Sequence, residues 1–185
     1  MAKQTIPNAG LWSSIAAILN GNFSQPSFGV YDYNDAATAI TPIPLVPDVW
    51  VALTNDEAGA FTNKTYAHPD IADVWNSTLN EFDFSDLDLG DTVDIRLDIN
   101  VTTTAQNQVV DVALFVNEGG AGEYVIPFIV EAPYKVSGTR EVIRWNGMYM
   151  GDANTRDSPA KFMIRSPSAG SVVVNGWYCR VSKRV

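Results

Sequence analysis

Hydrophobic and polar residues alternate along much of this chain after about residue 48. In VDIRLDINV, residues 93–101, every odd-numbered position is apolar and every even-numbered position is polar. Neighbouring side chains of a strand point to opposite faces, so this pattern predicts a half-buried β-strand. Residues 109–117 repeat the alternation after the turn-like TTTAQNQ. We therefore predict that the two segments pair as an antiparallel hairpin.

Further short apolar segments are separated by turns rich in Gly, Pro, Asn and Ser. They are residues 48–55, 124–132, 140–150, 160–166 and 171–182. Pro127 has no amide hydrogen to donate, so its segment is expected at a sheet edge or at a bulge. The chain lacks a βαβ rhythm and the Cys…Trp…Cys spacing of antibody domains. We therefore predict an all-β fold, an antiparallel jelly-roll sandwich, in preference to an immunoglobulin-like one.

The N-terminal segment LWSSIAAILNGNF, residues 11–23, has a helical rather than a strand pattern. Its apolar residues recur at helical spacing, and Asn20-Gly21 is a typical helix end. Such a short helix is not stable alone in water. It must pack on its own domain, or on neighbouring subunits or a larger assembly. The residues that we expect to mediate attachment or oligomerisation are Leu11, Trp12, Ile15, Ile18, Leu19 and Phe23.

Four prolines follow this segment, at positions 26, 42, 44 and 47. Proline at this density favours an extended, semi-rigid chain. We therefore predict two parts: residues 1–47 as an N-terminal helix with an extended attachment arm, and residues 48–185 as the β-sandwich domain.

The charges are few and unevenly distributed. Charged residues make up 18% of the chain, below the ~25% of an average soluble domain. Residues 134–185 hold nine Lys or Arg against three Asp or Glu (net +6), and residues 1–133 hold three against 18 (net −15), which gives the total of −9. This balance argues against nucleic acid as a partner. It favours acidic and basic parts that face each other within a chain or between chains.

The sequence offers little chemistry. His68 is the single histidine and lies beside Pro69, so we interpret it as an ordinary loop residue rather than a catalytic base. Cys179, the single cysteine, cannot form an intrachain disulfide and is expected in the core. No pair among the 21 acidic residues is marked out as a glycosidase pair. We expect a protein that is not an enzyme and that needs no cofactor.

An acidic stretch around Gly90 is the best metal candidate. Its carboxylates Asp86, Asp88 and Asp91 do not have the spacing of an EF-hand loop. A looser calcium loop is the alternative, and we predict no essential metal. No apolar run approaches the ~20 residues of a membrane span, so membrane insertion is not expected.

The tryptophans bear on sugar binding, because a stacking platform for a sugar needs an exposed aromatic ring. Trp50, Trp75, Trp145 and Trp177 lie in apolar segments. We therefore predict that they are mainly core residues.

The sequence resembles jelly-roll surface proteins of tailed-phage virions. LWSSIAAILNGNF is similar to the short helical openings of phage fibre and decoration proteins. The block FDFSDLDLGDTVDIRLDINVTTTAQNQVVDV resembles the first half of such a jelly roll, and MYMGDANTRDSPAKFMIRS and VVVNGWYCRV resemble its closing strands. The resemblance covers residues 80–185 and the opening segment, and this chain has neither the heptad shaft nor the repeats of a long fibre.

The resemblance implies a non-enzymatic structural protein on the virion surface, made in the host cytoplasm. It implies a homotrimeric knob, as in a capsid decoration or head fibre, attached to other virion proteins of the capsid or tail through the N-terminal segment. The alternatives are a tail-fibre or carbohydrate-binding module with a host surface glycan as partner, and a hydrolase using His68 or an Asp pair.

Overall fold

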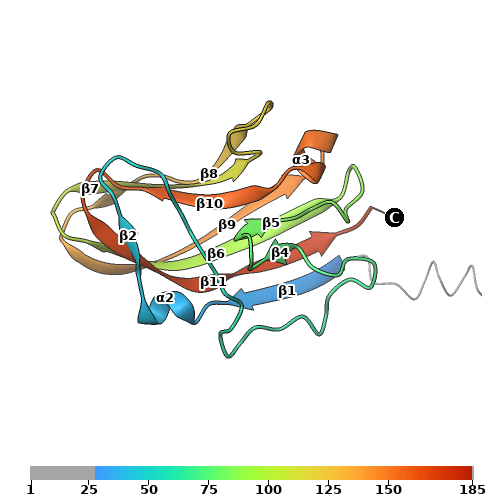
Figure 1. Cartoon of the computed structure of the whole chain (residues 1–185), viewed down its shortest axis with the longest axis horizontal. Coiled ribbons are helices and arrows are strands. Elements are labelled where there is room, and N and C mark those ends of the chain that lie inside the picture. Colours follow the sequence, from blue (N-terminus) through green and yellow to red (C-terminus); the bar gives the residue numbers. More distant parts are fainter. Residues whose placement is uncertain (1–27, 185) are drawn as a thin grey trace, which may run out of the picture.

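The computed structural model describes residues 28–184, which form two antiparallel β-sheets packed face to face (Figure 1). The first sheet has the order β1-β11-β6-β9, and the short strand β2 pairs with β11. Its strands are β1 (Phe28–Asn34), β2 (Ile43–Leu45), β6 (Thr92–Thr103), β9 (Gly138–Tyr149) and β11 (Gly170–Ser182).

The second sheet has the order β4-β5-β10-β7-β8, and β3 pairs with β10. Its strands are β3 (Val51–Ala52), β4 (Trp75–Asn76), β5 (Glu81–Phe82), β7 (Gln108–Val116), β8 (Tyr124–Tyr134) and β10 (Ala160–Arg165). Two short helices, α2 (Ala37–Ile40) and α3 (Ala153–Asp157), lie in connections. No helix in residues 28–184 is long and apolar enough to cross a membrane.

The strand order identifies the topology. We count β1 and β2, which both pair with β11, as the first strand, and β3, β4 and β5 as one interrupted second strand. The first sheet then contains strands one, eight, three and six of the chain. The second sheet contains strands two, seven, four and five. The chain thus passes repeatedly from one sheet to the other, as in the double Greek key of a jelly roll. The predicted fold class, an antiparallel jelly-roll sandwich, is confirmed.

The core lies between the two sheets and follows from the alternating pattern. The odd-numbered residues of β6 from Val93 to Thr103 are all buried, and their even-numbered neighbours are not. Large aromatic rings fill the centre: the Trp177 ring lies 4.6 Å from Trp75 and 5.5 Å from Phe162, measured between centroids. Edge-to-face and tilted contacts of this kind add to the free energy gained by burying apolar area.

The predicted hairpin between residues 93–101 and 109–117 is wrong. β6 pairs with β11 and β9 in the first sheet, whereas β7 pairs with β10 and β8 in the second. Both strands point an apolar face into the same core from opposite sides. An alternating pattern followed by a short turn fits such a crossing as well as it fits a hairpin.

The predicted arm is also wrong for residues 28–47. β1 pairs with β11 along its whole length, from Phe28 opposite Ser182 to Asn34 opposite Gly176. The described residues of this stretch therefore belong to the sandwich, and prolines 42 and 44 flank or interrupt the small strand β2. Strand pairing begins at residue 28 rather than 48, while residues 1–27 lie outside the described chain.

The two lateral flanks of the sandwich differ. Beyond β1, the segment 59–68 runs along the strand edge, and the Val30 and Asp32 N–H groups donate to the Tyr66 and Asn63 carbonyls at 2.9 Å. On the other side β8 and β9 form the edges of their sheets. Pro127 lies in edge strand β8 at a register irregularity, as predicted.

Candidate functional site

The residues predicted to mediate attachment lie outside the described chain. They are Leu11, Trp12, Ile15, Ile18, Leu19 and Phe23. Their helical pattern and their role therefore stay predictions.

His68 is a loop residue, as expected, but it is buried at 4% exposure. Its Nδ1 accepts the Asp70 N–H at 3.2 Å, and its own N–H donates to the Tyr31 hydroxyl at 3.1 Å. Within residues 28–184, no Ser, Thr or Cys side chain hydrogen-bonds to it. Its contacts fasten the loop to β1, and a nucleophile–base pair needs a different arrangement.

Cys179 lies in β11 and is fully buried, as predicted. Burial raises the pKa of its thiol well above the ordinary value, and nearby Asp73 and Asp32 add to the effect. A reactive thiol needs the opposite shift together with access to solvent. The side chain therefore behaves as a small core residue.

The acidic loop around Gly90 is closed by its own hydrogen bonds. Asp91 is fully buried, and its carboxylate accepts the N–H groups of Asp88 at 2.9 Å and Arg184 at 2.7 Å. The Asp88 carboxylate lies 3.1 Å from Lys183 Nζ. The loop thus anchors the C-terminal residues to the sandwich. In the described part of the chain no three His, Cys, Asp or Glu side chains converge as metal ligands would.

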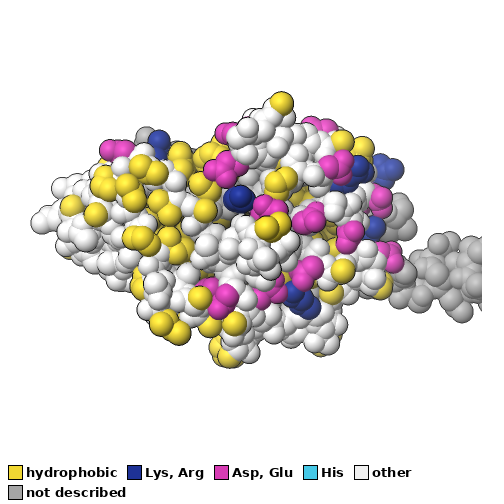
Figure 2. All heavy atoms as spheres, viewed as in Figure 1, with side chains coloured by type: hydrophobic (Ala, Val, Ile, Leu, Met, Phe, Trp, Pro, Cys, Tyr) yellow, Lys and Arg dark blue, Asp and Glu magenta, His cyan; other side chains and the backbone are white. Residues whose placement is uncertain are grey.

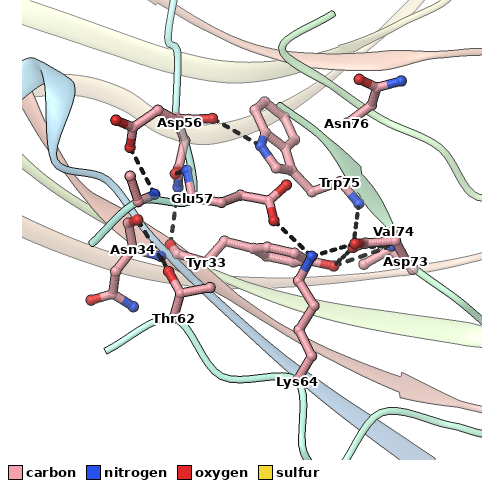
Figure 3. Close-up of polar contacts among 12 residues, drawn as sticks. Tyr33, Asn34, Asp56, Glu57, Thr62, Lys64, Asp73, Val74, Trp75 and Asn76 are labelled. Atoms are coloured by element: carbon pink, nitrogen blue, oxygen red, sulfur yellow. Dashed lines mark hydrogen bonds and ion pairs between the residues drawn. The ribbon is translucent and has the colours of Figure 1, made fainter. Parts of the chain in front are cut away.

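A polar network lies on the flank beside β1 and is the most developed polar site of the described residues (Figure 3). Its centre is Asp73, which precedes β4. The Asp73 carboxylate accepts hydrogen bonds from the buried Tyr33 hydroxyl and from the N–H groups of Val74 and Trp75. It also forms an ion pair with Lys64. A strand, a loop and the start of a second strand are thus tied together at one carboxylate.

Lys64 bridges two carboxylates in this network. Its Nζ contacts Asp73 and lies 2.6 Å from the Glu57 carboxylate, and it stands over the Tyr33 ring, 4.9 Å from the centroid. Burial disfavours the charged ammonium, but the hydrogen bonds with Asp73 and Glu57 outweigh it and raise the pKa of Lys64. The pKa of Tyr33 is raised strongly, chiefly by burial. The tyrosine stays neutral and the lysine charged over the whole physiological range.

An open hollow of about 410 Å³ adjoins the network. It is lined by Glu57, Asp73, Trp75, Asn76, Ser77 and Asp83. Figure 2 shows Asp and Glu side chains gathered over β4, β5 and the segment in front of them. Because Asp73 already accepts from several donors, it is poorly suited to act as a general base. The arrangement suits a rigid acidic surface that contacts a basic or hydroxyl-rich partner.

The prediction that the tryptophans are core residues holds for two of the four. Trp75 and Trp177 are buried, whereas Trp145 is 55% exposed on β9. Trp50 is half-buried in a shallow hollow of about 260 Å³ on the outer face of the second sheet. Its ring meets Phe115 edge to face at 5.1 Å, and the Arg165 guanidinium lies 4.9 Å above it.

Sequence reasoning missed the network around Lys64. Its members Tyr33, Glu57, Lys64 and Asp73 are spread over some 40 residues without a recurring motif. One signal was present: Lys64 is the single Lys or Arg among six acidic residues in 51–83. A lone basic residue in an acidic segment is a candidate for a shared ion pair, but the sequence does not say which carboxylates it meets.

No protein-family model and no curated protein matches the sequence. Solved structures match in shape. A chain of the T13 viral particle of infectious bursal disease virus is 8% identical, with a TM-score of 0.50 over 86% of this chain and 32% of that chain. A chain of the Gx strain of the same virus is 9% identical, with a TM-score of 0.49 over 85% and 34%.

The chain spans about a third of the length of those viral chains. The CBM22-1 xylan-binding domain of Paenibacillus barcinonensis Xyn10C also matches, at 8% identity and a TM-score of 0.41, over 84% of this chain and 94% of that domain. At such low identity the likeness to the first viral chain concerns the fold alone. The fold is a jelly roll. The resemblance to tailed phages in particular stays a prediction.

Proposed function

We propose that this protein is a non-enzymatic structural protein of a virion, in which the jelly roll forms a homotrimeric knob on the particle surface. The observation that carries the proposal is the strand order, with strands one, eight, three and six in one sheet and two, seven, four and five in the other. Jelly rolls of this kind occur in viral capsids, as well as in lectin domains and cupins. The likeness to a chain of a viral particle supports the same role.

In this proposal the N-terminal segment attaches the knob to the capsid or tail of a phage particle. The apolar stripe Leu11, Ile15 and Ile18 would be buried against the particle, where a buried side chain of this size stabilises by about 1.5–3 kcal/mol. The test is cosedimentation of purified protein with particles that lack it. Replacing these three residues by Ser should abolish cosedimentation and leave the circular dichroism of the sandwich unchanged.

The matched control changes Ser13 to Ala and Ala17 to Ser, at two positions of the same segment that lie on the other side of the predicted helix from the stripe. This variant should bind particles as the unmodified protein does. If the stripe variant also binds normally, attachment through the N-terminal segment is wrong. Light scattering should give the mass of three chains, and a monomer at micromolar concentration would contradict the trimer.

A second candidate function is glycan binding on the outer face of the second sheet. Trp50 is the observation that favours it, because its half-buried ring lies in a hollow beside the ion pair of Arg165 and Asp111, whose N–O distance is 2.8 Å. Aromatic rings beside charged groups can stack on sugars. Tryptophan fluorescence during titration with host-surface oligosaccharides tests it, with Trp50→Ala as the variant and Trp145→Ala as the control. A response that Trp50→Ala leaves unchanged would rule out this hollow.

A further inference from the structure

Strand β9 is a long edge strand whose outer side pairs with no other described strand. It has 12 residues and pairs with β6 alone, so its length is about 40 Å. Large apolar side chains on it face solvent: Ile143 is 43%, Trp145 55% and Tyr149 66% exposed. Val136, in the preceding loop, and Val125, on β8, are exposed on the same flank. We call β8, β9 and residues 135–137 the β9 flank.

The β9 flank is basic. Residues 124–149 contain Lys135, Arg140 and Arg144 against Glu131 and Glu141, so their net charge is +1. Arg140 lies over the Tyr134 ring at 5.3 Å, and Arg144 donates to the Ile143 carbonyl at 2.8 Å. Within the described chain neither arginine forms an ion pair with an acidic side chain. Both arginine residues are exposed.

The opposite flank carries the complementary charge. Residues 51–83 contain six Asp or Glu against Lys64, a net charge of −5, and they include the hollow of about 410 Å³. We call this segment the acidic flank. Lys64 neutralises part of the charge of Asp73 and Glu57, while Asp70 and Asp83 lie exposed. The acidic flank therefore retains negative charge after its internal ion pair is counted.

We propose that the β9 flank of one copy docks on the acidic flank of a second copy of this chain. The two surfaces lie on opposite sides of one sandwich, so the contact is head to tail. Such a contact gives a closed ring, as the proposed trimer requires, when the rotation between neighbouring copies closes, and an open filament when it does not. Arg140 and Arg144 of one copy then face carboxylates of the next, while Ile143, Trp145 and Tyr149 lie on the opposite, outward face of β9. This inference rests on the proposed homo-oligomer and assigns its contact surfaces.

The charges argue against the simplest alternative, a symmetric pairing of two β9 edges. Arg140 and Arg144 sit on the face of β9 that looks toward the other sheet, because they pair with the inward residues Val101 and Leu97 of β6. Inward-pointing charges on an edge strand oppose edge-to-edge pairing. In a symmetric pair, Arg140 and Arg144 of one chain would also lie close to the same arginines of the other chain, and the repulsion between like charges disfavours this arrangement.

The test is the concentration dependence of molecular mass, measured by sedimentation equilibrium on the full chain. Changing Arg140 and Arg144 to Glu should weaken association by about 100-fold, because it places like charges opposite each other. The control changes Arg156 and Arg184 to Glu. It makes the same change in net charge near α3 and the C-terminal end, and should associate as the unmodified protein does.

Charge exchange identifies the partner surface. Adding Asp70→Lys and Asp83→Lys to the Arg140→Glu, Arg144→Glu chain should restore association, because both surfaces are then reversed. A symmetric β9 contact predicts no such rescue. As a measurement that needs no variant, 0.5 M NaCl should weaken association of the unmodified protein at least tenfold, because salt screens exposed charges.

The outcomes separate the two proposals. If the unmodified protein is an oligomer that neither the arginine changes nor salt weaken, the assigned surfaces are wrong while the homo-oligomer stands. If arginine changes weaken association but the double reversal fails to restore it, the acidic flank is not the partner surface, and the inference is overturned. If the unmodified protein is a monomer at micromolar concentration, the inference and the trimer both fail, whereas attachment through the N-terminal segment is unaffected.

Discussion

The two edge strands of the first sheet, β1 and β9, differ in what lies beside them. At β1 the chain covers its own edge: segment 59–68 donates and accepts backbone hydrogen bonds, and the Lys64 network ties it down. At β9 no further described strand is added, and Ile143, Trp145 and Tyr149 face solvent. An exposed edge is a site for association. One flank is thus completed within the chain, and in our proposal the other is completed by a second copy.

Close backbone packing accompanies the covered flank. A Cβ on Gly29 would lie 2.3 Å from the His68 nitrogen, and one on Gly176 would lie 2.3 Å from the Tyr33 carbonyl oxygen. On β9, a Cβ on Gly147 would instead meet a side-chain oxygen of Asp94, at 2.8 Å, and that carboxylate can rotate away. The β1 flank is therefore sensitive to small changes that the β9 flank accommodates.

The largest expected effect compares two aromatic side chains, one from each flank. Tyr33 is fully buried, so Tyr33→Ala should lower the free energy of unfolding by about 3–5 kcal/mol. Trp145→Ala, on β9, should lower it by only about 1 kcal/mol in the dissociated chain, because the ring is 55% exposed and its edge-to-face contact with Tyr178 is the main one lost. Urea unfolding at low protein concentration measures the free energy of unfolding of both variants. Similar losses of stability in the two variants would contradict the distinction between the flanks.

A pair of glycine substitutions sharpens the comparison. Gly176 has a φ of +155° and no room for a Cβ, so Gly176→Ala should cost about 2–3 kcal/mol through strain and displacement of β1. Gly147→Ala should cost under about 1 kcal/mol, because Asp94 can take another rotamer. Thermal unfolding of the two variants provides the measurement. If Gly147→Ala lowers the unfolding temperature more than Gly176→Ala does, the result would contradict this account.

The ion-pair network gives a smaller effect. Lys64→Met leaves Asp73 and Glu57 close together without their shared cation, and should lower the free energy of unfolding by about 1–2 kcal/mol. Lys161 is a matched control of similar exposure, because its Nζ also lies between two carboxylates but farther from them, 3.8 Å from Glu81 and 3.9 Å from Glu118. Lys161→Met should cost no more than about 0.5 kcal/mol. Equal losses in the free energy of unfolding would show that the network around Lys64 stabilises the fold no more than the Lys161 ion pairs do.

The smallest effect appears at alkaline pH. Burial raises the pKa of Tyr33 in the folded chain, so unfolding above about pH 10 releases its proton. Its contribution to stability is therefore fully present below pH 10 and is lost as the pH rises, by about 1.4 kcal/mol per unit for one such group. Tyr33→Phe should have a shallower decline between pH 10 and 11 in urea unfolding. An unchanged slope would mean that Tyr33 does not titrate on unfolding.

The sequence carried enough information for the fold class but not for the strand partners. Alternation in residues 93–101 correctly identified a strand with one buried face, and Pro127 correctly identified an edge. The same alternation could not distinguish a hairpin from a crossing between sheets, so β6 and β7 were wrongly paired. Prolines 42, 44 and 47 suggested an arm because they disfavour regular strands, although β1 lies just before them in the sheet.

The candidate site was less predictable because it depends on contacts between distant residues. The hydrogen bond from Tyr33 to Asp73 spans 40 residues, and no spacing rule links the two. Exposure of Trp145 was missed for a related reason. Its segment is apolar like a core strand, but Trp145 pairs with the outward-pointing Arg96 of β6 and so lies on the outer face of the sheet, and that register cannot be read from the segment itself.

Hydrogen exchange at low and high protein concentration tests the central contrast between the two flanks most directly. We predict that residues 139–149 and residues 69–83 both gain protection as concentration rises, because they meet in neighbouring copies. Amides of β1, residues 28–34, should be protected equally at both concentrations, because the chain itself covers that edge. Protection gained in β1, or in neither 139–149 nor 69–83, would contradict the account.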